Sequence, residues 1–305
     1  MPDGLPNFFT ATAGLTNLAI ELCDILELPR FFTAEGFTDC FQENFLRPSE
    51  LERYQCSRLP PAAKNMDRGA FYELCRRWGF LEEILPRRAL GDYDAILIYA
   101  LGVEGMCAAG HYLKNQLLLA KEQGATFLPD IFVLTGSRLL TMEGEEAMAE
   151  HLRERHLPDT EEWAARLLFR HALQDLEKSF EIVSVPMQQT HDAGGTCVWR
   201  RPDTRDTLRA FFSQCGAREQ NSLLAISLNP FVSYQHAVGL ATWREKGGAA
   251  FYPQALETVG PLHPRFMLER WKSDEERLIA ILLDNFARCA YEELGLLVKR
   301  GAESC

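Results

Sequence analysis

Paired cysteines, long apolar runs and an excess of basic charge are all missing from this chain of 305 residues. None of its nine cysteines belongs to a Cys-x-x-Cys pair, and their total is odd. Zinc sites need closely spaced pairs, and disulfide frameworks belong to short secreted chains. The cysteines therefore indicate single thiols in a reducing compartment and no metal site.

The charge and the first residues favour a cytoplasmic protein. Forty-three acidic against thirty-two basic residues give a formal charge of −11, which opposes binding to nucleic acid or to an anionic membrane. Residues 1–6 lack the basic and apolar regions of a signal peptide, and no stretch approaches the length of a membrane span. We expect a small-molecule ligand, and no nucleic-acid or membrane partner.

Several common catalytic patterns are also absent from the sequence. No serine lies in a Gly-x-Ser-x-Gly turn, and no cysteine has a histidine placed as a catalytic partner. The chain has no helical histidine pair beside a glutamate, no phosphate-binding loop with its lysine and no complete Gly-x-Gly-x-x-Gly motif. Covalent hydrolysis and zinc-dependent proteolysis therefore have no support.

What the sequence does contain is a series of short apolar segments separated by helix-forming stretches. Residues 94–102 are apolar on both alternating faces and end in glycine, which is typical of a central strand in a parallel sheet. Similar segments follow at 130–136, 181–185 and 222–228, with a weaker one near 249–252. Strands alternating with helices predict an open, mostly parallel, Rossmann-like α/β sheet with helices on both faces.

Helical patterns at both ends of the chain predict two further parts. Residues 1–90 carry only helical patterns and are expected to form an N-terminal helical lobe, followed by the α/β domain at 91–262. Residues 263–305 are expected to form a C-terminal helical segment that packs on the sheet domain. The last helix has more apolar residues than one buried face needs, which leaves open a surface for a protein partner or a second copy of the chain.

The turns after the strands hold the candidate site residues, because ligands of open α/β sheets bind beyond the carboxyl ends of the strands. Glycines at Gly102 and Gly136 allow close approach to the backbone, and the helix starts behind them offer free N–H groups. Glu146 and Asp206, at helix starts, are candidates for a general base. Helix capping is the alternative role for such polar groups. The other candidates for ligand contact are Ser137, Thr207, Asn229 and Gln235.

The least regular stretch of the chain is 186–201, after the third predicted strand. It contains His191, Asp192, Gly194 and Gly195, which combine polar side chains with backbone freedom. We expect a mobile loop that shapes the mouth of the site, with a simple exposed connector as the alternative.

Five motifs follow one another along residues 92–260: Asp94-Ala-Ile-Leu-Ile before a glycine turn, Leu134-Thr-Gly-Ser, Glu145-Glu146-Ala147, Asp203-Thr204-Arg205-Asp206-Thr207 and Leu224-Ala-Ile-Ser-Leu-Asn-Pro. Their order resembles the YdcF, SanA and ElyC family of domains of unknown function. The resemblance implies a parallel α/β sheet with a helical annex. For the YdcF branch it also implies an adenosine-type ligand such as S-adenosylmethionine, with contacts at Glu146, Asp206, Thr207 and residues 229–235.

The sequence thus predicts a cytoplasmic α/β protein that binds a nucleotide-like small molecule at the carboxyl ends of its strands. Two alternatives stay open. One is a hydrolase or phosphoryl-transfer enzyme acting on a phosphorylated metabolite, with Glu146 or Asp206 as the general base. The other is a non-catalytic interaction protein that uses the helical lobe and the last helix.

Overall fold

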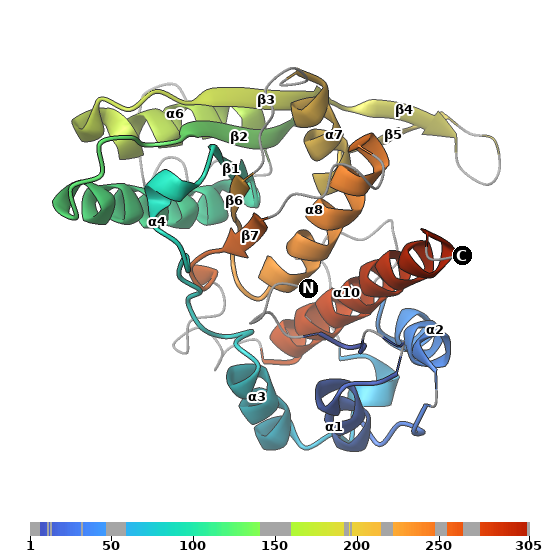
Figure 1. Ribbon diagram of the computed structural model, residues 1–305. Helices are drawn as coiled ribbons and strands as arrows, with labels where there is room; N and C mark the ends of the chain where they lie inside the picture. Colours follow the sequence, from blue (N-terminus) through green and yellow to red (C-terminus); the bar gives the residue numbers. More distant parts are fainter. Residues whose placement is uncertain are drawn as a thin grey trace. The chain divides into compact units, whose positions relative to one another are not determined.

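The computed structural model divides the chain into two compact units (Figure 1). The helical unit combines Met1–Ile84, Asn229–Ala241 and Arg265–Cys305, and the sheet unit combines Leu85–Leu228 and Thr242–Pro264. The residues that the structure describes are 7–10, 12, 14–31, 33–46, 59–140, 160–191, 195, 197–214, 222–247, 255–264 and 275–303.

Five parallel strands form the main sheet, in the order β3-β2-β1-β6-β7. The central strand β1 has all five residues buried, and its Ala95 lies opposite Asp130 of β2 and Leu223 of β6. This arrangement confirms the predicted open, Rossmann-like α/β fold. The strands are β1 (Ala95–Tyr99), β2 (Asp130–Ser137), β3 (Glu181–Pro186), β6 (Ser222–Ile226) and β7 (Ala255–Val259).

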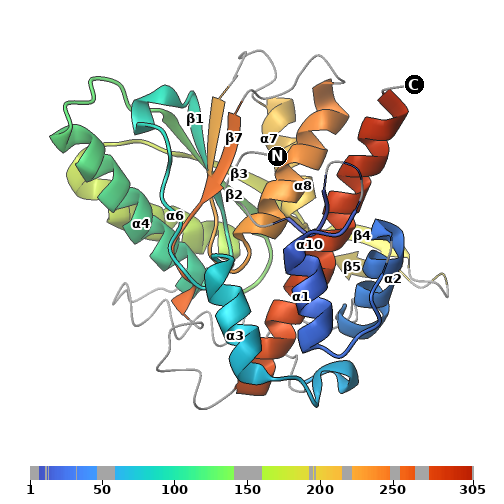
Figure 2. The ribbon, with the colours of Figure 1, turned by 60° about the horizontal axis from the view of Figure 1, so that its bottom comes forward.

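Helices cover both faces of this sheet. Figure 2 shows α4 (Gly102–Glu122) and α6 (Glu161–Leu173) side by side on one face and α7 (Thr204–Gln214) on the other. On the α7 side, the ring centroids of Phe211 and Phe132 of β2 are 5.0 Å apart. Coverage of both faces explains why the first four of the five residues of β1 are aliphatic.

The fifth strand of the described sheet, β7, lies outside the segments predicted as strands. The predicted residues 249–252 lie outside the described residues, and the described fifth strand is β7, at the edge of the sheet. Its central residue is Glu257, whose carboxylate accepts hydrogen bonds from the hydroxyl of Tyr93 and, at 2.9 Å, from the N–H of Arg87. A charged residue in the middle of a short edge strand interrupts the apolar pattern by which strands are recognised in a sequence.

The segment 186–201 contains regular structure, so its reading as an irregular loop is wrong. Strands β4 (Gln188–His191) and β5 (Cys197–Arg200) pair in antiparallel fashion, with His191 opposite Cys197. Gly195, in the connection, has a φ of +79°. Residues 192–194 and 196 lie outside the described residues, and the proposed role of this segment as a lid stays a prediction.

The last helix, α10 (Glu275–Glu303), groups with the N-terminal helices, and α2 (Ala34–Phe45) packs against it. The sequence instead predicts residues 263–305 as a separate segment on the sheet domain, and that placement stays a prediction. Thr16 caps α1 by accepting a hydrogen bond from the N–H of Ala19 at 3.5 Å. The remaining helices are α1 (Asn17–Ile25), α3 (Arg68–Arg77), α8 (Val232–Gly247) and the 3-10 helices Pro61–Ala63, Leu90–Asp92 and Gln174–Leu176. None of the described helices is long and apolar enough to cross a membrane.

A cluster of aromatic rings forms the core of the helical unit. Phe286 of α10 lies at its centre, with ring centroids 5.7 Å from Phe8, 6.1 Å from Phe71 and 4.6 Å from Phe80. Much of the apolar surface of α10 is used in this way. Among the apolar residues of α10, Leu278, Ile281, Leu282 and Leu296 are buried, and Leu294 and Leu297 are half-buried.

One carboxylate is buried in the same unit. Glu293 accepts a hydrogen bond from the N–H of Phe8 at 2.8 Å and another from the thiol of Cys289 at 3.2 Å. Burial raises the pKa of Glu293 to about 7, and these donors offset the burial only in part. Burial also raises the pKa of Cys289 well above its ordinary value, so the thiol stays a hydrogen-bond donor.

We therefore expect the helical unit to lose stability between about pH 4.5 and pH 7. The pKa of Glu293 is raised from 4.5 to about 7, so its stabilising contribution is complete below pH 4.5 and is lost as the pH rises through 7. The loss has an upper bound of roughly 3 kcal/mol. Urea denaturation across this pH range measures it, and Glu293→Gln should flatten the profile whereas Glu292→Gln, on the same helix, should not. An unaltered profile in Glu293→Gln would contradict the assignment.

Candidate functional site

The strand order reverses at β1, since β2 and β3 lie on one side of it and β6 and β7 on the other. The chain leaves the carboxyl ends of β1 and β6 at this reversal. Ligands of open α/β sheets bind there, because the connections on either side turn away from each other. The candidate site of the sheet unit is therefore built from the turn after β1 and the segments after β6 and β7.

Gly102 starts α4 directly after β1 and has a φ of +73°, a left-handed conformation that favours glycine. Apart from its chain neighbours and the backbone of its own helix, no described heavy atom lies within 4 Å of the place where a Cβ would stand. Leu101, at the start of the helix, makes no side-chain hydrogen bond to the first turn of α4. The described residues thus leave space beside Gly102 and no side-chain cap on a helix start, and such helix starts can bind an anion.

The next residues of α4 lie against the ends of the other two strands. A Cβ at Gly105 would stand 2.7 Å from Cδ1 of Leu228 and 3.7 Å from Nε2 of His263. Glycine is therefore needed for this approach, and it brings an imidazole beside the first turn of α4. His263 is buried, with 8% of its surface exposed.

Ser227 follows β6 and is fully buried, and its N–H donates to the carbonyl of Val259 at 2.8 Å. A Cβ at Gly260 would stand 2.0 Å from the carbonyl oxygen of Ser227, so only glycine fits. Ser227 and His263 are not among the site residues predicted from the sequence. Ser227 lies inside the predicted segment 222–228, and it proves to follow the strand because β6 ends at Ile226. His263 belongs to the Gly260-Pro-Leu-His263 turn, which is recognisable only with β7 in place.

Gly136 serves packing at the end of β2. A Cβ there would stand 2.7 Å from Cγ of Pro202, so the approach of this proline, before α7, explains the glycine. The hydroxyl of Ser137 donates to Oε2 of Glu162 at 2.9 Å and lies 2.7 Å from the hydroxyl of Ser184. Contact of Gly136 and Ser137 with a ligand stays a prediction.

The carboxylate of Glu162 is the centre of this polar cluster. Hydrogen bonds from Ser184 and Ser137 and the charge of Arg166 hold the pKa of Glu162 below its usual range. Glu162 therefore stays ionised at neutral pH and acts as a hydrogen-bond acceptor. Beside it, Arg138 forms two hydrogen bonds, of 2.8 and 2.9 Å, with the buried Glu161 and ties the start of α6 to the end of β2.

Asp206 caps α7 and forms an ion pair. Its Oδ2 accepts from Arg200 of β5 at 2.7 Å and from the N–H of Asp203 at 3.0 Å, and Asp203 in turn accepts from the N–H of Asp206 at 3.0 Å. The hydroxyl of Thr207 donates to the carbonyl of Thr204 at 3.0 Å. Capping thus accounts for both candidates, and a general-base or ligand-binding role for them stays a prediction.

The other predicted site residues lie elsewhere in the chain. Asn229 and Gln235 belong to the helical unit and are each 1% exposed. The side-chain amide of Asn229 donates to the carbonyl of Glu82 at 2.8 Å and to that of Gly79. Glu146 lies outside the described residues. Within those residues, no group of three histidine, cysteine or acidic side chains could hold a metal ion.

The fold defines this chain as an open α/β protein with Rossmann-like strand order. No family model, no curated protein and no solved structure matches it. The resemblance to the YdcF, SanA and ElyC family therefore stays a prediction, and the local geometry is the basis for a functional proposal.

The role of Asp206 as a structural partner of Arg200 leads to a measurable coupling. A double-mutant cycle with Arg200→Met and Asp206→Asn should give a coupling of roughly 1 kcal/mol, because the Asp206 side chain is 10% exposed. Arg200 also pairs with Asp203, at 3.2 Å, but that side chain is 56% exposed. The same cycle with Asp203→Asn is the control and should give a few tenths of a kcal/mol at most. Equal couplings from urea denaturation would refute the assignment.

Proposed function

We propose that this chain binds a nucleotide-like small molecule of adenosine type, such as S-adenosylmethionine, at the carboxyl ends of the strands in the sheet unit. The observation that carries the proposal is the turn from β1 to α4. It lies where the strand order reverses, Gly102 leaves space beside its backbone, and the first helical turn has no side-chain cap at its start. The N–H groups and the dipole of such a helix start favour the anionic group of a ligand.

Polar groups close to this turn suit the rest of such a molecule. Glu104 is in the first turn of α4, where a carboxylate can accept hydrogen bonds from ribose hydroxyls. His263 lies beside Gly105 and offers an imidazole to a heterocycle or a hydroxyl group. A few polar groups set in an otherwise apolar surface are typical of small-molecule sites.

The wider setting follows from the charge and the cysteines. We place the protein in the cytoplasm, with a small-molecule ligand and without a nucleic-acid or membrane partner, because the formal charge is −11 and the nine cysteines show no paired spacing. A protein partner or a second copy of the chain is compatible with this binding role. The hydrolase alternative gains nothing from the described residues, since the carboxylate of Asp206 is held by Arg200 and Asp203.

Isothermal titration calorimetry with S-adenosylmethionine, S-adenosylhomocysteine, adenosine, ATP and NAD tests the proposal. We expect heat from at least one adenosine compound. Gly102→Ala should weaken that binding about tenfold, the effect of roughly 1.4 kcal/mol, because the new methyl group occupies the space at the helix start.

Gly124→Ala is the matched control. Gly124 follows the other end of α4 and has a φ of +83°. As at Gly102, no described heavy atom beyond its chain neighbours lies within 4 Å of its Cβ position. Both variants should lose about 1 kcal/mol of stability from backbone strain, while only Gly102→Ala should lose affinity. The proposal fails if no adenosine compound binds, or if the two variants weaken binding equally.

A further inference from the structure

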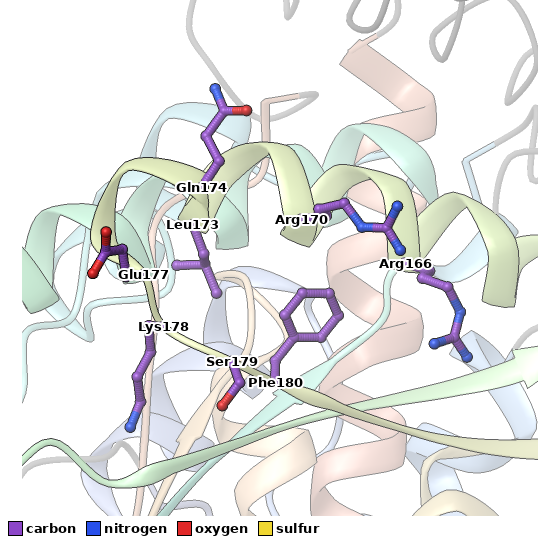
Figure 3. Close-up of a pocket in the computed structure, with 8 residues that line it drawn as sticks. All are labelled: Arg166, Arg170, Leu173, Gln174, Glu177, Lys178, Ser179 and Phe180. Carbon is purple, nitrogen blue, oxygen red and sulfur yellow. The ribbon is translucent and has the colours of Figure 1, made fainter.

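A hollow of about 280 Å³ lies between α6 and the segment that leads into β3 (Figure 3). Arg166, Arg170 and Gln174 line it from the α6 side, and Lys178 and Phe180 line it from the other. Because the hollow is at the amino end of β3, the six residues of that strand separate it from the carboxyl ends by roughly 20 Å. It is therefore distinct from the site proposed above.

The charge of the hollow is opposite to that of the whole chain. Three cationic side chains and one carboxylate, that of Glu177, line it, whereas the chain carries a formal charge of −11. Arg166 and Arg170 are four residues apart on α6, so they lie on the same face and repel each other. An anion between them would relieve this repulsion.

The three cations differ in the partners they have within the described residues. Lys178 donates to the carbonyl of Leu128 at 2.9 Å and is held against the protein. Arg166 lies 3.5 Å from Glu162, in a half-exposed pair. Arg170 forms no hydrogen bond or ion pair with any described residue. Within the described residues, the guanidinium of Arg170 is therefore available to a ligand, and that of Arg166 is only weakly paired.

The hollow also has an apolar wall. The half-buried ring of Phe180 faces the side of the hollow from which the two arginines project, and Leu173 forms part of the floor (Figure 3). The Phe180 ring is held in place by Phe169, with centroids 6.1 Å apart. A planar apolar surface beside two guanidinium groups suits a ligand that joins an anionic group to a ring.

We propose that this hollow binds a small phosphomonoester that carries an aromatic or apolar group. Guanidinium groups recognise phosphate through paired hydrogen bonds, which assigns the phosphate to Arg170 and Arg166 and the ring to Phe180. The volume is at the lower end of the range for small-molecule sites, about 300 Å³, so the ligand is smaller than a dinucleotide.

Phenyl phosphate is the probe, with inorganic phosphate and phenol for comparison. Calorimetry is done at low ionic strength, because salt screens exposed charges. It should give the tightest binding for phenyl phosphate, weaker binding for inorganic phosphate and none for phenol. Replacing both arginines, with Arg166→Ala and Arg170→Ala, should weaken phenyl phosphate binding by about tenfold or more. Phe180→Leu should weaken phenyl phosphate alone and leave inorganic phosphate unaffected.

Two controls separate this site from general charge effects and from the proposed adenosine site. Arg76→Ala removes an exposed arginine from α3, in the helical unit, and should leave the binding of phenyl phosphate unaltered. Gly102→Ala should also leave this binding unaltered.

The proposal is overturned if the double arginine variant binds as tightly as the wild type, or if Arg76→Ala causes an equal loss. Thermal unfolding of the double variant checks that it is folded, and Arg170→Lys gives a second test, since it keeps the charge but loses the paired hydrogen bonds.

Discussion

All five residues of β1 are buried, and the strand is hydrogen-bonded to β2 on one side and to β6 on the other. Neither its faces nor its edges meet water, so Ala95–Ile98 are aliphatic and both neighbouring strands must be present to satisfy the backbone. The crossovers through α4 on one side and back to β6 on the other then fix where the strand order reverses. The location of the candidate site is thus a consequence of the burial of one strand.

The sequence predicts β1, β2, β3 and β6 because each is a short apolar run between helical patterns. Burial on both faces requires that pattern in β1, β2 and β6, whereas the edge strand β3 has only Val183 buried. The sequence does not single out β7, because Glu257 interrupts the apolar run to accept hydrogen bonds from Tyr93 and Arg87. The hairpin of β4 and β5 is missed for another reason. Its strands have four residues each, too few for a periodic pattern to stand out.

A site residue can be predicted from the sequence only where its role follows from its neighbours in the chain. Gly102 is such a case, because a glycine directly after a central strand is visible in the sequence. Gly136 is not, since its reason is the ring of Pro202, which comes from far along the chain. For Asp206, a capping carboxylate and a catalytic carboxylate look the same in sequence, and only the contact with Arg200 separates them. Asn229 is near β6 in the chain, yet it belongs to the helical unit.

Arg166 stands between two clusters on the same helix. Its guanidinium is 3.5 Å from Glu162, which binds the hydroxyl of Ser137 at the carboxyl end of β2, and it also lines the hollow at the amino end of β3. An anion that binds Arg166 would leave Glu162, among the described residues, with only the hydroxyls of Ser137 and Ser184 as partners. Linkage requires the converse: a group that replaces Arg166 at Glu162 would raise the affinity of the hollow for the anion. The two ends of α6 would therefore act as thermodynamic antagonists through one shared side chain, without any movement of the backbone.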